Sequence, residues 1–349
     1  MAKDREKEAR ERAMSRIREA RSKPADSAER WIEQVAGGDR GALARCISIV
    51  ESVRPEDRPL AEALLGQAVQ CGGHARRYGI TGIPGAGKST WIEAAGITLV
   101  ERGHRVAVLA VDPSSGRTGG SLLGDKTRMA TLAQHPQAFV RPSPSGKTLG
   151  GIAAATGEAA LLCEAAGFDR ILIETVGVGQ SETEVRRMTD LFMLMLIPGG
   201  GDGVQGIKRG ILEWADAVWV NKADGGRERI EAAGATLNVY RSALSLLAAP
   251  AEGEPPLFGQ GSALDRNMVA EWIGQLEARL DDAAASGSLH ARRRRQMMES
   301  LDDLLEREAL LQVRNHPQFP EAWQRLQDDL PRLQTLPFAQ VRQLLEGLD

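Results

Sequence analysis

The stretch that decides the fold is Gly82-Ile83-Pro84-Gly85-Ala86-Gly87-Lys88-Ser89, which matches the pattern G-x-x-x-x-G-K-S/T over its whole length. It follows an apolar run, Tyr78–Thr81, that is typical of a buried strand, and it leads into a helical pattern over Lys88–Arg102. In this context glycines let backbone N–H groups turn toward phosphates, the lysine reaches the β- and γ-phosphates, and the hydroxyl binds Mg²⁺. We therefore predict a phosphate-binding loop over these residues and the adjoining Thr90.

Strand and helix patterns alternate around this loop. The further expected strands are short, nearly continuous apolar runs, as in parallel sheets covered on both faces: Val106–Asp112, Ala138–Arg141, Ile171–Glu174, Leu191–Ile197, Ala217–Asn221 and Leu257–Gly261. The further expected helices are Thr148–Ala166, Glu182–Thr189, Gly206–Ala215, Arg227–Leu247 and Asn267–Leu280. The pattern predicts an α/β P-loop NTPase fold over residues 71–280, with a mainly parallel central sheet flanked by helices.

Helical patterns also flank this domain at both ends. Residues 1–70 form an expected N-terminal helical region: a charged helix up to Ser22, then Ser27–Ala36, Gly41–Ser52 and Pro59–Gln70. The small, polar stretch Asp281–Ser288 indicates a boundary, so that residues 281–349 form a C-terminal arm, which Pro317, Pro320, Pro331 and Pro337 divide into short helices. Its apolar stripe, which includes Met298, Leu301 and Leu305, is too large for the arm to bury alone. We expect the arm to pack on the core or on a second subunit.

Composition excludes several classes of protein. The chain has 349 residues, of which 42% are apolar, and the charges of its 44 basic and 47 acidic side chains nearly cancel. This composition argues against a disordered polyelectrolyte and against a protein whose overall positive charge attracts nucleic acid. No apolar run is long enough for a membrane span. The three cysteines, Cys46, Cys71 and Cys163, are far apart and indicate neither a disulfide framework nor a zinc site, which favours a reducing, cytoplasmic location. We expect the basic run Arg292–Arg295 to be a solvated helix face and not a nucleic-acid site.

A second motif points to the base of a nucleotide. Asn221-Lys222-Ala223-Asp224 follows an expected strand and matches N-K-x-D, in which the carboxylate accepts hydrogen bonds from guanine. Adenine offers no such pair of donors and would leave the carboxylate unpaired. Ser262-Ala263-Leu264 follows the last expected strand and is placed to make a backbone contact with the guanine carbonyl. The two segments predict a guanine site.

Carboxylates and glycine-rich loops follow other strands of the same sheet. Asp112 and Glu174 each end an expected strand, so both should lie near the phosphates and Mg²⁺. Long glycine-rich loops are expected over residues 113–126, 142–151 and 198–206, where compact domains commonly place functional loops. In and beside these loops are charged and polar candidates: Asp125, Lys126, Arg128, Asp202, Gln205 and Lys208.

Taken together the motifs resemble a known family. They run from Asp112-Pro113-Ser114-Ser115 through Gly124-Asp125-Lys126-Thr127-Arg128-Met129, Glu174-Thr175-Val176-Gly177-Val178-Gly179-Gln180-Ser181-Glu182 and Gln205-Gly206-Ile207-Lys208 to Asn221-Lys222-Ala223-Asp224. This set is similar to the MeaB/ArgK family of SIMIBI-class GTPases, which are chaperones of adenosylcobalamin-dependent acyl-CoA mutases.

The resemblance implies roles for the residues. Lys88, Asp112, Asp125 and Glu174 would form the phosphate and Mg²⁺ cluster with Ser89, and Lys88, Asp125 and Glu174 would be catalytic. Asp112–Arg128 would be switch I, Glu174–Glu184 with Gly177 and Gln180 switch II, and Pro198–Lys208 a third switch that reports the GTP or GDP state to the mutase. The arm would form a homodimer. The chain would gate cobalamin transfer from an adenosyltransferase into the mutase, which itself binds the cobalamin.

One segment departs from the family pattern. The third switch usually reads Gly-Asp-Glu-Leu-Gln-Gly, whereas this chain has Gly201-Asp202-Gly203-Val204-Gln205-Gly206. The N-terminal helix before Pro24 does not match the family pattern either. The two regions suggest a client other than methylmalonyl-CoA mutase, such as an isobutyryl- or hydroxyisobutyryl-CoA mutase.

Three other functions are alternatives. A nickel-inserting GTPase would need clustered histidines or cysteines, and the five histidines are isolated in the sequence. An ATP-dependent small-molecule kinase is opposed by the N-K-x-D motif. A nucleotide-dependent adaptor, whose slow hydrolysis is incidental to protein binding, remains open.

Overall fold

The computed structural model describes most of the chain. The described residues are 23–52, 54–71, 73, 75–112, 129–144, 151–175, 181–199, 214–246, 254–329, 341–342 and 344–345. The chain divides into two compact units, Met1–Arg293 and Arg294–Asp349. The sheet and the candidate site belong to the first unit.

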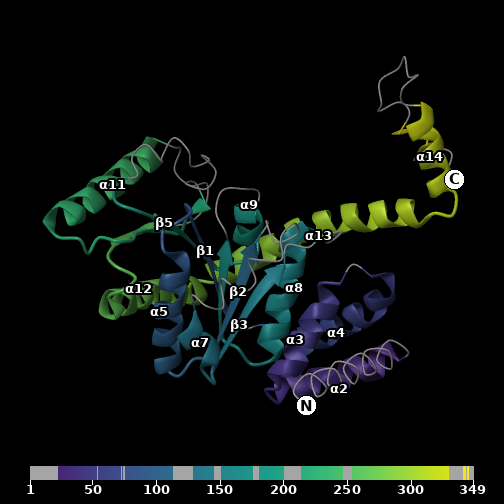
Figure 1. Ribbon diagram of the computed structural model, residues 1–349, viewed down its shortest axis with the longest axis horizontal. Helices are drawn as coiled ribbons and strands as arrows, with labels where there is room; N and C mark the ends of the chain where they lie inside the picture. The colour runs from purple at the N-terminus through teal and green to yellow at the C-terminus, as the bar shows by residue number, and fades with distance from the viewer. Residues whose placement is uncertain are drawn as a thin grey trace, which may run out of the picture. The chain divides into compact units, whose positions relative to one another are not determined.

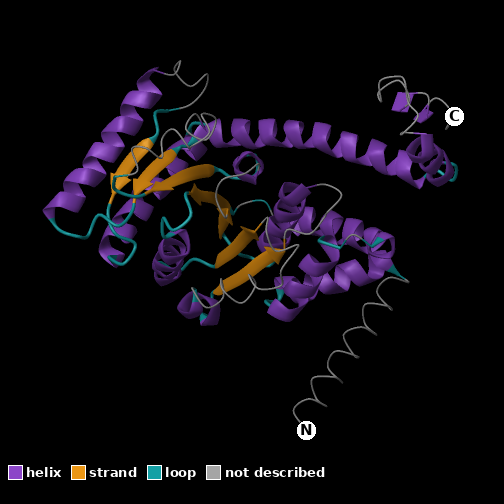
Figure 2. Cartoon of the chain, turned by 45° about the horizontal axis from the view of Figure 1, so that its top comes forward, coloured by secondary structure: helices purple, strands orange, loops and turns teal. Residues whose placement is uncertain are grey.

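The first unit is built on one seven-stranded sheet with the order β3-β2-β4-β1-β5-β6-β7, in which every neighbouring pair is parallel. The strands are β1 (Arg76–Gly82), β2 (Val106–Asp112), β3 (Ala138–Pro144), β4 (Arg170–Thr175), β5 (Leu191–Leu196), β6 (Ala217–Val220) and β7 (Leu257–Gln260). Figure 2 shows them as a continuous twisted layer between helices. The predicted strands and the predicted P-loop NTPase fold are confirmed. The strands are continuous apolar runs because helices cover both faces of the sheet.

One face of the sheet is covered by α5 (Lys88–Glu101), α7 (Ala130–Gln134) and α12 (Arg266–Ala285), which lie on the same side in Figure 1. Strand side chains alternate between the faces, so Ile80 and Met193 point into this layer and pack with apolar residues of the three helices. This layer places the amino end of α5 directly after β1.

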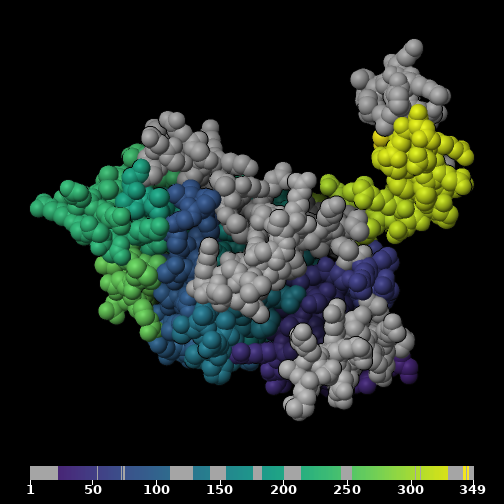
Figure 3. All heavy atoms as spheres, in the orientation of Figure 1, coloured from purple at the N-terminus to yellow at the C-terminus, as the bar shows by residue number. Residues whose placement is uncertain are grey.

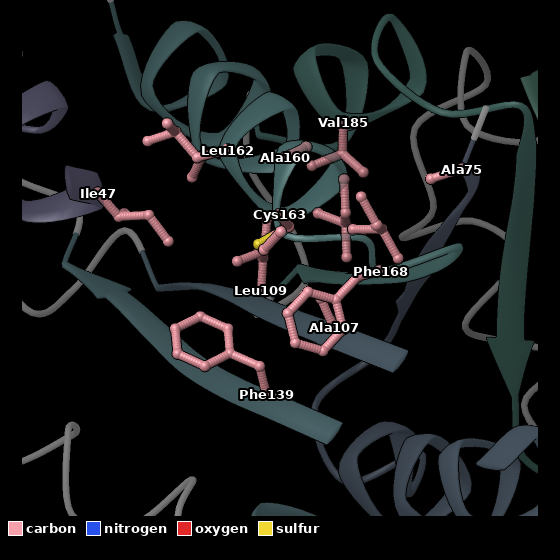
Figure 4. Close-up of a cluster of buried hydrophobic side chains, with 14 of the residues drawn as sticks. Ile47, Ala75, Ala107, Leu109, Phe139, Ala160, Leu162, Cys163, Phe168 and Val185 are labelled. Atoms are coloured by element: carbon pink, nitrogen blue, oxygen red, sulfur yellow. The ribbon is translucent and has the colours of Figure 1, made fainter. Parts of the chain in front are cut away.

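The other face is covered by α8 (Gly151–Ala165), α9 (Ser181–Arg186) and α11 (Arg227–Leu246), together with the N-terminal helices. The N-terminal elements are α2 (Pro24–Ala36), α3 (Arg40–Val50), the short 3-10 helix η1 (Pro55–Asp57) and α4 (Arg58–Cys71). Their apolar residues join one core with the sheet, which Figure 4 shows where Ile47 of α3 approaches Leu162 of α8 and Leu109 of β2. In Figure 3 the purple N-terminal helices lie against the teal region of α8 and β3.

The stretch Asp281–Ser288, which we expected to be a boundary, is helical over most of its length. Helix α12 continues to Ala285, and the next helix, α13 (Ser288–Asn315), begins after a break at Ser286 and Gly287. Gly287 has a φ of +79°, a left-handed conformation that glycine adopts without strain. Alanines dominate the end of α12, and their high helix propensity explains why small residues continue the helix here. The expected helices before Ser22 and over 206–213 lie outside the described residues.

The second unit begins at Arg294 and contains the remainder of α13, followed by the whole of α14 (Phe319–Asp329). No proline interrupts α13, which is 28 residues long, so the expected short helices begin only after Pro317. Its apolar side chains are exposed at helical spacing, namely Met297, Met298, Leu301, Leu304, Leu305 and Leu310, and we call this set the α13 stripe. Within the described residues, no helix is both long and apolar enough to cross a lipid bilayer.

The run Arg292–Arg295 is not a uniformly solvated face. Arg293 donates to both carboxylate oxygens of buried Asp190, at 2.7 and 2.6 Å. Arg292 donates to both oxygens of Asp216, at 2.7 and 3.1 Å. Asp190 and Asp216 immediately precede β5 and β6, so the two arginines fasten the start of α13 to the amino end of the sheet, and only Arg294 and Arg295 are exposed.

Candidate functional site

The loop between β1 and α5 needs glycine at its first and sixth positions. Gly82 has a φ of +152°, and a Cβ there would lie 2.2 Å from the Met195 carbonyl oxygen. Gly87 has a φ of +89°, and a Cβ there would lie 2.5 Å from Asn221 Nδ2. Any side chain at either position would displace β5 or Asn221. The two glycines of the G-x-x-x-x-G pattern are therefore fixed by the fold as well as by the ligand they would bind.

Lys88 and Ser89 are the first two residues of α5 and directly follow Gly87. Both are buried, and Lys88 Nζ donates to the carbonyl oxygens of Gly82 and Ile83 at 2.8 and 3.3 Å. Ser89 Oγ donates to Glu174 Oε1 at 3.0 Å, across from the end of β4. A lysine held over a loop of backbone amides at a helix amino end is the arrangement that binds phosphate.

The Ser89–Glu174 pair also has the chemistry of a magnesium site. A hydroxyl and a carboxylate are the hard oxygen ligands that Mg²⁺ prefers, and the ion usually takes few protein ligands beside phosphate and water. Asp112 ends β2 at the same edge, because Val111 pairs with Thr175 of β4. Among the described residues there is no group of three or more His, Cys, Asp or Glu that could hold a metal alone. The residues thus fit an ion that is shared with a bound phosphate.

Asn221 links the phosphate-binding loop to the predicted base-binding segment. Its Nδ2 donates to the Ala86 carbonyl at 2.7 Å, and its Oδ1 accepts from the Ala263 amide at 2.8 Å. Asn221 is 2% exposed, so both contacts are protected from water. One side chain therefore fixes the distance between the part of the site that suits phosphate and the part that suits a base.

Asp224 lies beside Ser262, as the two sequence motifs predict. Ser262 Oγ donates to Asp224 Oδ2 at 2.7 Å, and this hydrogen bond holds the pKa of Asp224 below its ordinary value. The carboxylate is exposed and ionised at neutral pH, so it is available to accept hydrogen bonds from a base. Lys222, in the same motif as Asp224, adopts a left-handed backbone conformation with a φ of +61°. Leu264, two residues after Ser262, is 77% exposed.

Several other predicted site residues have no described side-chain contact. Thr90 is exposed on α5. Asp125, Arg128, Gly177, Gln180, Asp202, Gln205 and Lys208 lie outside the described residues, and of Asp112 only the backbone is described. One anchor of the third loop was missed by sequence reasoning: Thr236 Oγ1 on α11 accepts from the Gly199 amide at 3.2 Å. No local pattern marks a contact between residues so far apart in the sequence.

Comparison with known proteins agrees with this geometry. Residues 43–318 match the family model described as methylmalonyl Co-A mutase-associated GTPase MeaB. The chain belongs to the MeaB family. It is therefore a SIMIBI-class P-loop GTPase, as the motifs predict, and the predicted family is confirmed.

Individual relatives cover most of the chain. A Mycobacterium tuberculosis protein named as a probable GTPase is 46% identical over 321 residues, 92% of this chain and 95% of that protein. GTPase ArgK of Escherichia coli is 45% identical over 280 residues, 80% of this chain and 84% of that protein. The mitochondrial methylmalonic aciduria type A homolog of Mus musculus is 43% identical over 314 residues, covering 85% and 74%. A crystal structure titled LAO/AO transport system kinase is 34% identical, with a TM-score of 0.70 over 93% of this chain and 98% of that chain.

Proposed function

We propose that this chain binds GTP and GDP with Mg²⁺ and uses GTP hydrolysis to gate cobalamin loading of an adenosylcobalamin-dependent acyl-CoA mutase. The observation that carries the nucleotide part is the Asn221 link, which joins the phosphate-binding loop to Ala263 beside the Ser262–Asp224 pair. With that spacing fixed, a guanine nucleotide can occupy both parts of the site at once.

Hydrolysis would proceed by positioning and electrostatics. Lys88 Nζ exchanges the Gly82 and Ile83 carbonyls for phosphate oxygens, and the loop amides donate to the same group. Ser89 and Glu174, with Asp112 and Asp125, hold Mg²⁺, which neutralises charge on the phosphates when it is bound. Arg128, Gly177, Gln180, Asp202, Gln205 and Lys208 belong to the three switch segments that respond to the γ-phosphate.

The mutase partner is supported by the relatives. The family is named for its association with methylmalonyl-CoA mutase, and the mouse relative for methylmalonic aciduria. In our proposal the mutase holds the cobalamin, a cobalamin adenosyltransferase delivers it, and this chain times the transfer and the release of damaged cofactor. The Gly203-Val204 segment of the third switch, where the family usually has Glu-Leu, favours an isobutyryl- or hydroxyisobutyryl-CoA mutase over methylmalonyl-CoA mutase as the client.

We also propose that the arm over residues 281–349 mediates homodimerisation, with residues 71–280 as the GTPase domain. The α13 stripe supports this, because exposed leucines and methionines at helical spacing are typical of a helix that packs on a partner. Leu301→Glu together with Leu305→Glu would then give a monomer in sedimentation analysis.

The partner proposal is tested by complex formation with purified candidate mutases. We expect a complex whose stability differs between a non-hydrolysable GTP analogue and GDP, and GTP hydrolysis that the client mutase accelerates. The variant Gly203→Glu, which restores an acid in the third switch, should shift preference toward methylmalonyl-CoA mutase. Equal binding in all nucleotide states, with no acceleration by any of the three mutases, would contradict the chaperone function and favour a simple adaptor.

A further inference from the structure

The end of β4 makes two polar side-chain contacts, one on each face of the sheet. On the α5 face, Ser89 donates to Glu174. On the opposite face, the Thr175 hydroxyl donates to Thr81 Oγ1 at 2.9 Å. Because Ile80 pairs with Glu174 in the parallel register, Thr81 lies beside Thr175. The end of β4 is therefore joined to α5 on one face of the sheet and to β1 on the other.

The threonine pair is buried in apolar surroundings. Thr175 is 0% and Thr81 is 1% exposed, and on the same face lie Ile173 of β4 and Leu194 of β5. Valine has the same shape as threonine and would fill these positions without a hydroxyl that must be satisfied. Packing alone does not explain two hydroxyls here, whereas a hydrogen bond between the strands does.

The position of the pair gives that hydrogen bond a mechanical role. Thr81 directly precedes Gly82, whose carbonyl oxygen accepts from Lys88 Nζ. Thr175 directly follows Glu174, where the described part of β4 ends. A shift of the β4 end relative to the phosphate-binding loop would stretch the threonine bond, so the bond limits where the Glu174 carboxylate can lie.

We propose that Thr81 and Thr175 are positioning residues that hold Glu174 at the distance from Ser89 at which both can bind Mg²⁺. This inference rests on the proposed function. The Ser89–Glu174 contact is made by the groups that would bind the metal, whereas the threonine pair lies on the opposite face of the sheet. The threonines would therefore act through Glu174 and not as metal ligands themselves.

The test uses matched variants of the full chain. Thr175→Ser and Thr175→Ala both remove the γ-methyl group and differ only in the hydroxyl. The readout is the dissociation constant of a fluorescent GDP derivative, measured with Mg²⁺ and with EDTA, so that the gain in affinity due to Mg²⁺ is obtained without hydrolysis. Thr98→Ala is the control, because Thr98 is a buried threonine whose hydroxyl donates to Ala94 of its own helix at 2.9 Å.

We expect Thr175→Ala to reduce the Mg²⁺-dependent gain about 5- to 10-fold, the effect of losing one buried hydrogen bond, while affinity in EDTA is unchanged. Thr175→Ser and Thr98→Ala should keep the gain. Thr81→Ala should match Thr175→Ala, and the double variant should be no worse than either, because the two residues make one bond. If Thr175→Ala does not fold, Thr175→Val, which preserves the packed volume, replaces it.

Three results would overturn the inference: a full Mg²⁺ effect in Thr175→Ala, an equal loss in Thr175→Ser, or an equal loss in Thr98→Ala. A wild-type chain that binds GDP equally well with and without Mg²⁺ is a different result. It would refute the magnesium part of the proposed function and the inference together. The wild-type measurement thus separates the two failures.

Discussion

The two ends of the same parallel strands are built on opposite principles. At the carboxyl end, Lys88, Glu174 and Asp224 each make a hydrogen bond to a neutral group, which is a backbone carbonyl or a serine hydroxyl. At the amino end, charged groups contact one another in arginine–carboxylate pairs, such as Arg293 with Asp190. Contacts with neutral partners can be exchanged for a phosphate, a metal or a base, whereas a buried ion pair cannot open without leaving an unpaired charge.

A second group at the amino end shows the same principle. Glu277 of α12 accepts from Arg76 at 3.0 Å, from Arg170 at 2.7 and 3.0 Å, and from the Tyr78 hydroxyl. Burial raises the pKa of Glu277 and lowers that of Arg170, so desolvation outweighs the attraction at both partners. The amino end therefore fixes helices to the sheet at some electrostatic cost, and the carboxyl end remains available for ligands.

The largest effect should come from removing the carboxyl-end lysine. Lys88→Ala should lower the GTP hydrolysis rate at least about 100-fold, because a cation aimed at the transferring phosphoryl group is lost. Phosphate release under single-turnover conditions measures it. Arg76→Gln, at the other end of the preceding strand, is the matched control and should hydrolyse GTP at the wild-type rate. Full turnover by Lys88→Ala would refute the assigned loop.

Next in size is a change at the amino end. Arg293→Ala leaves Asp190 buried without its bidentate partner, and we expect the free energy of unfolding to fall by about 3 kcal/mol. Urea denaturation measures the loss, and Arg294→Ala is the control, since Arg294 is exposed and makes no ion pair with any residue that the structure describes. The KM for GTP should not change in either variant. A fall in nucleotide affinity without loss of stability would contradict the assignment of Arg293 to a structural role at the amino end.

A substitution of Asp224, which we propose binds the base, should change nucleotide specificity and leave stability unchanged. In Asp224→Asn the carboxylate acceptor becomes an amide whose NH₂ group can donate to the 2-carbonyl of xanthine but repels the guanine amine. GDP affinity should fall by about 10- to 200-fold, the range for a lost polar contact at a recognition site, while XDP affinity rises. Competition against a fluorescent nucleotide measures both, and unchanged GDP binding would remove Asp224 from the site.

The smallest expected effect is the pH dependence of stability that Glu277 causes at the amino end of the strands. Because its pKa is raised, Glu277 binds a proton more tightly in the folded state than in the unfolded state. Its contribution to the free energy of unfolding is therefore complete below the unfolded-state pKa and is lost as the pH rises through the folded-state pKa. Wild type should thus lose stability relative to Glu277→Gln as the pH rises across this range, by less than Arg293→Ala costs. Urea denaturation at several pH values measures the difference, and a trend of the opposite sign would contradict it.

The contrast between the ends also explains what the sequence could predict. The strands and the phosphate-binding loop were predictable, because continuous apolar runs and the Gly82–Ser89 pattern are local signals. The motifs at two strand ends predicted that Ser262 and Asp224 belong to one site, but not the hydrogen bond between them. The amino-end pairs were not predictable: Arg293 lies far along the chain from Asp190, and a basic run alone indicates a solvated face. The Thr81–Thr175 bond was missed because threonine in a strand needs no special explanation.

We propose that the carboxyl end of the strands is a guanine nucleotide site that works with Mg²⁺. Titration calorimetry of the full chain with GDP, a non-hydrolysable GTP analogue and the matching ATP analogue, each in Mg²⁺, tests this proposal. Our account predicts that both guanine nucleotides bind and that the adenine nucleotide binds at least about 100-fold more weakly, since Asp224 would lose its partners. Equal or tighter binding of the ATP analogue would contradict it.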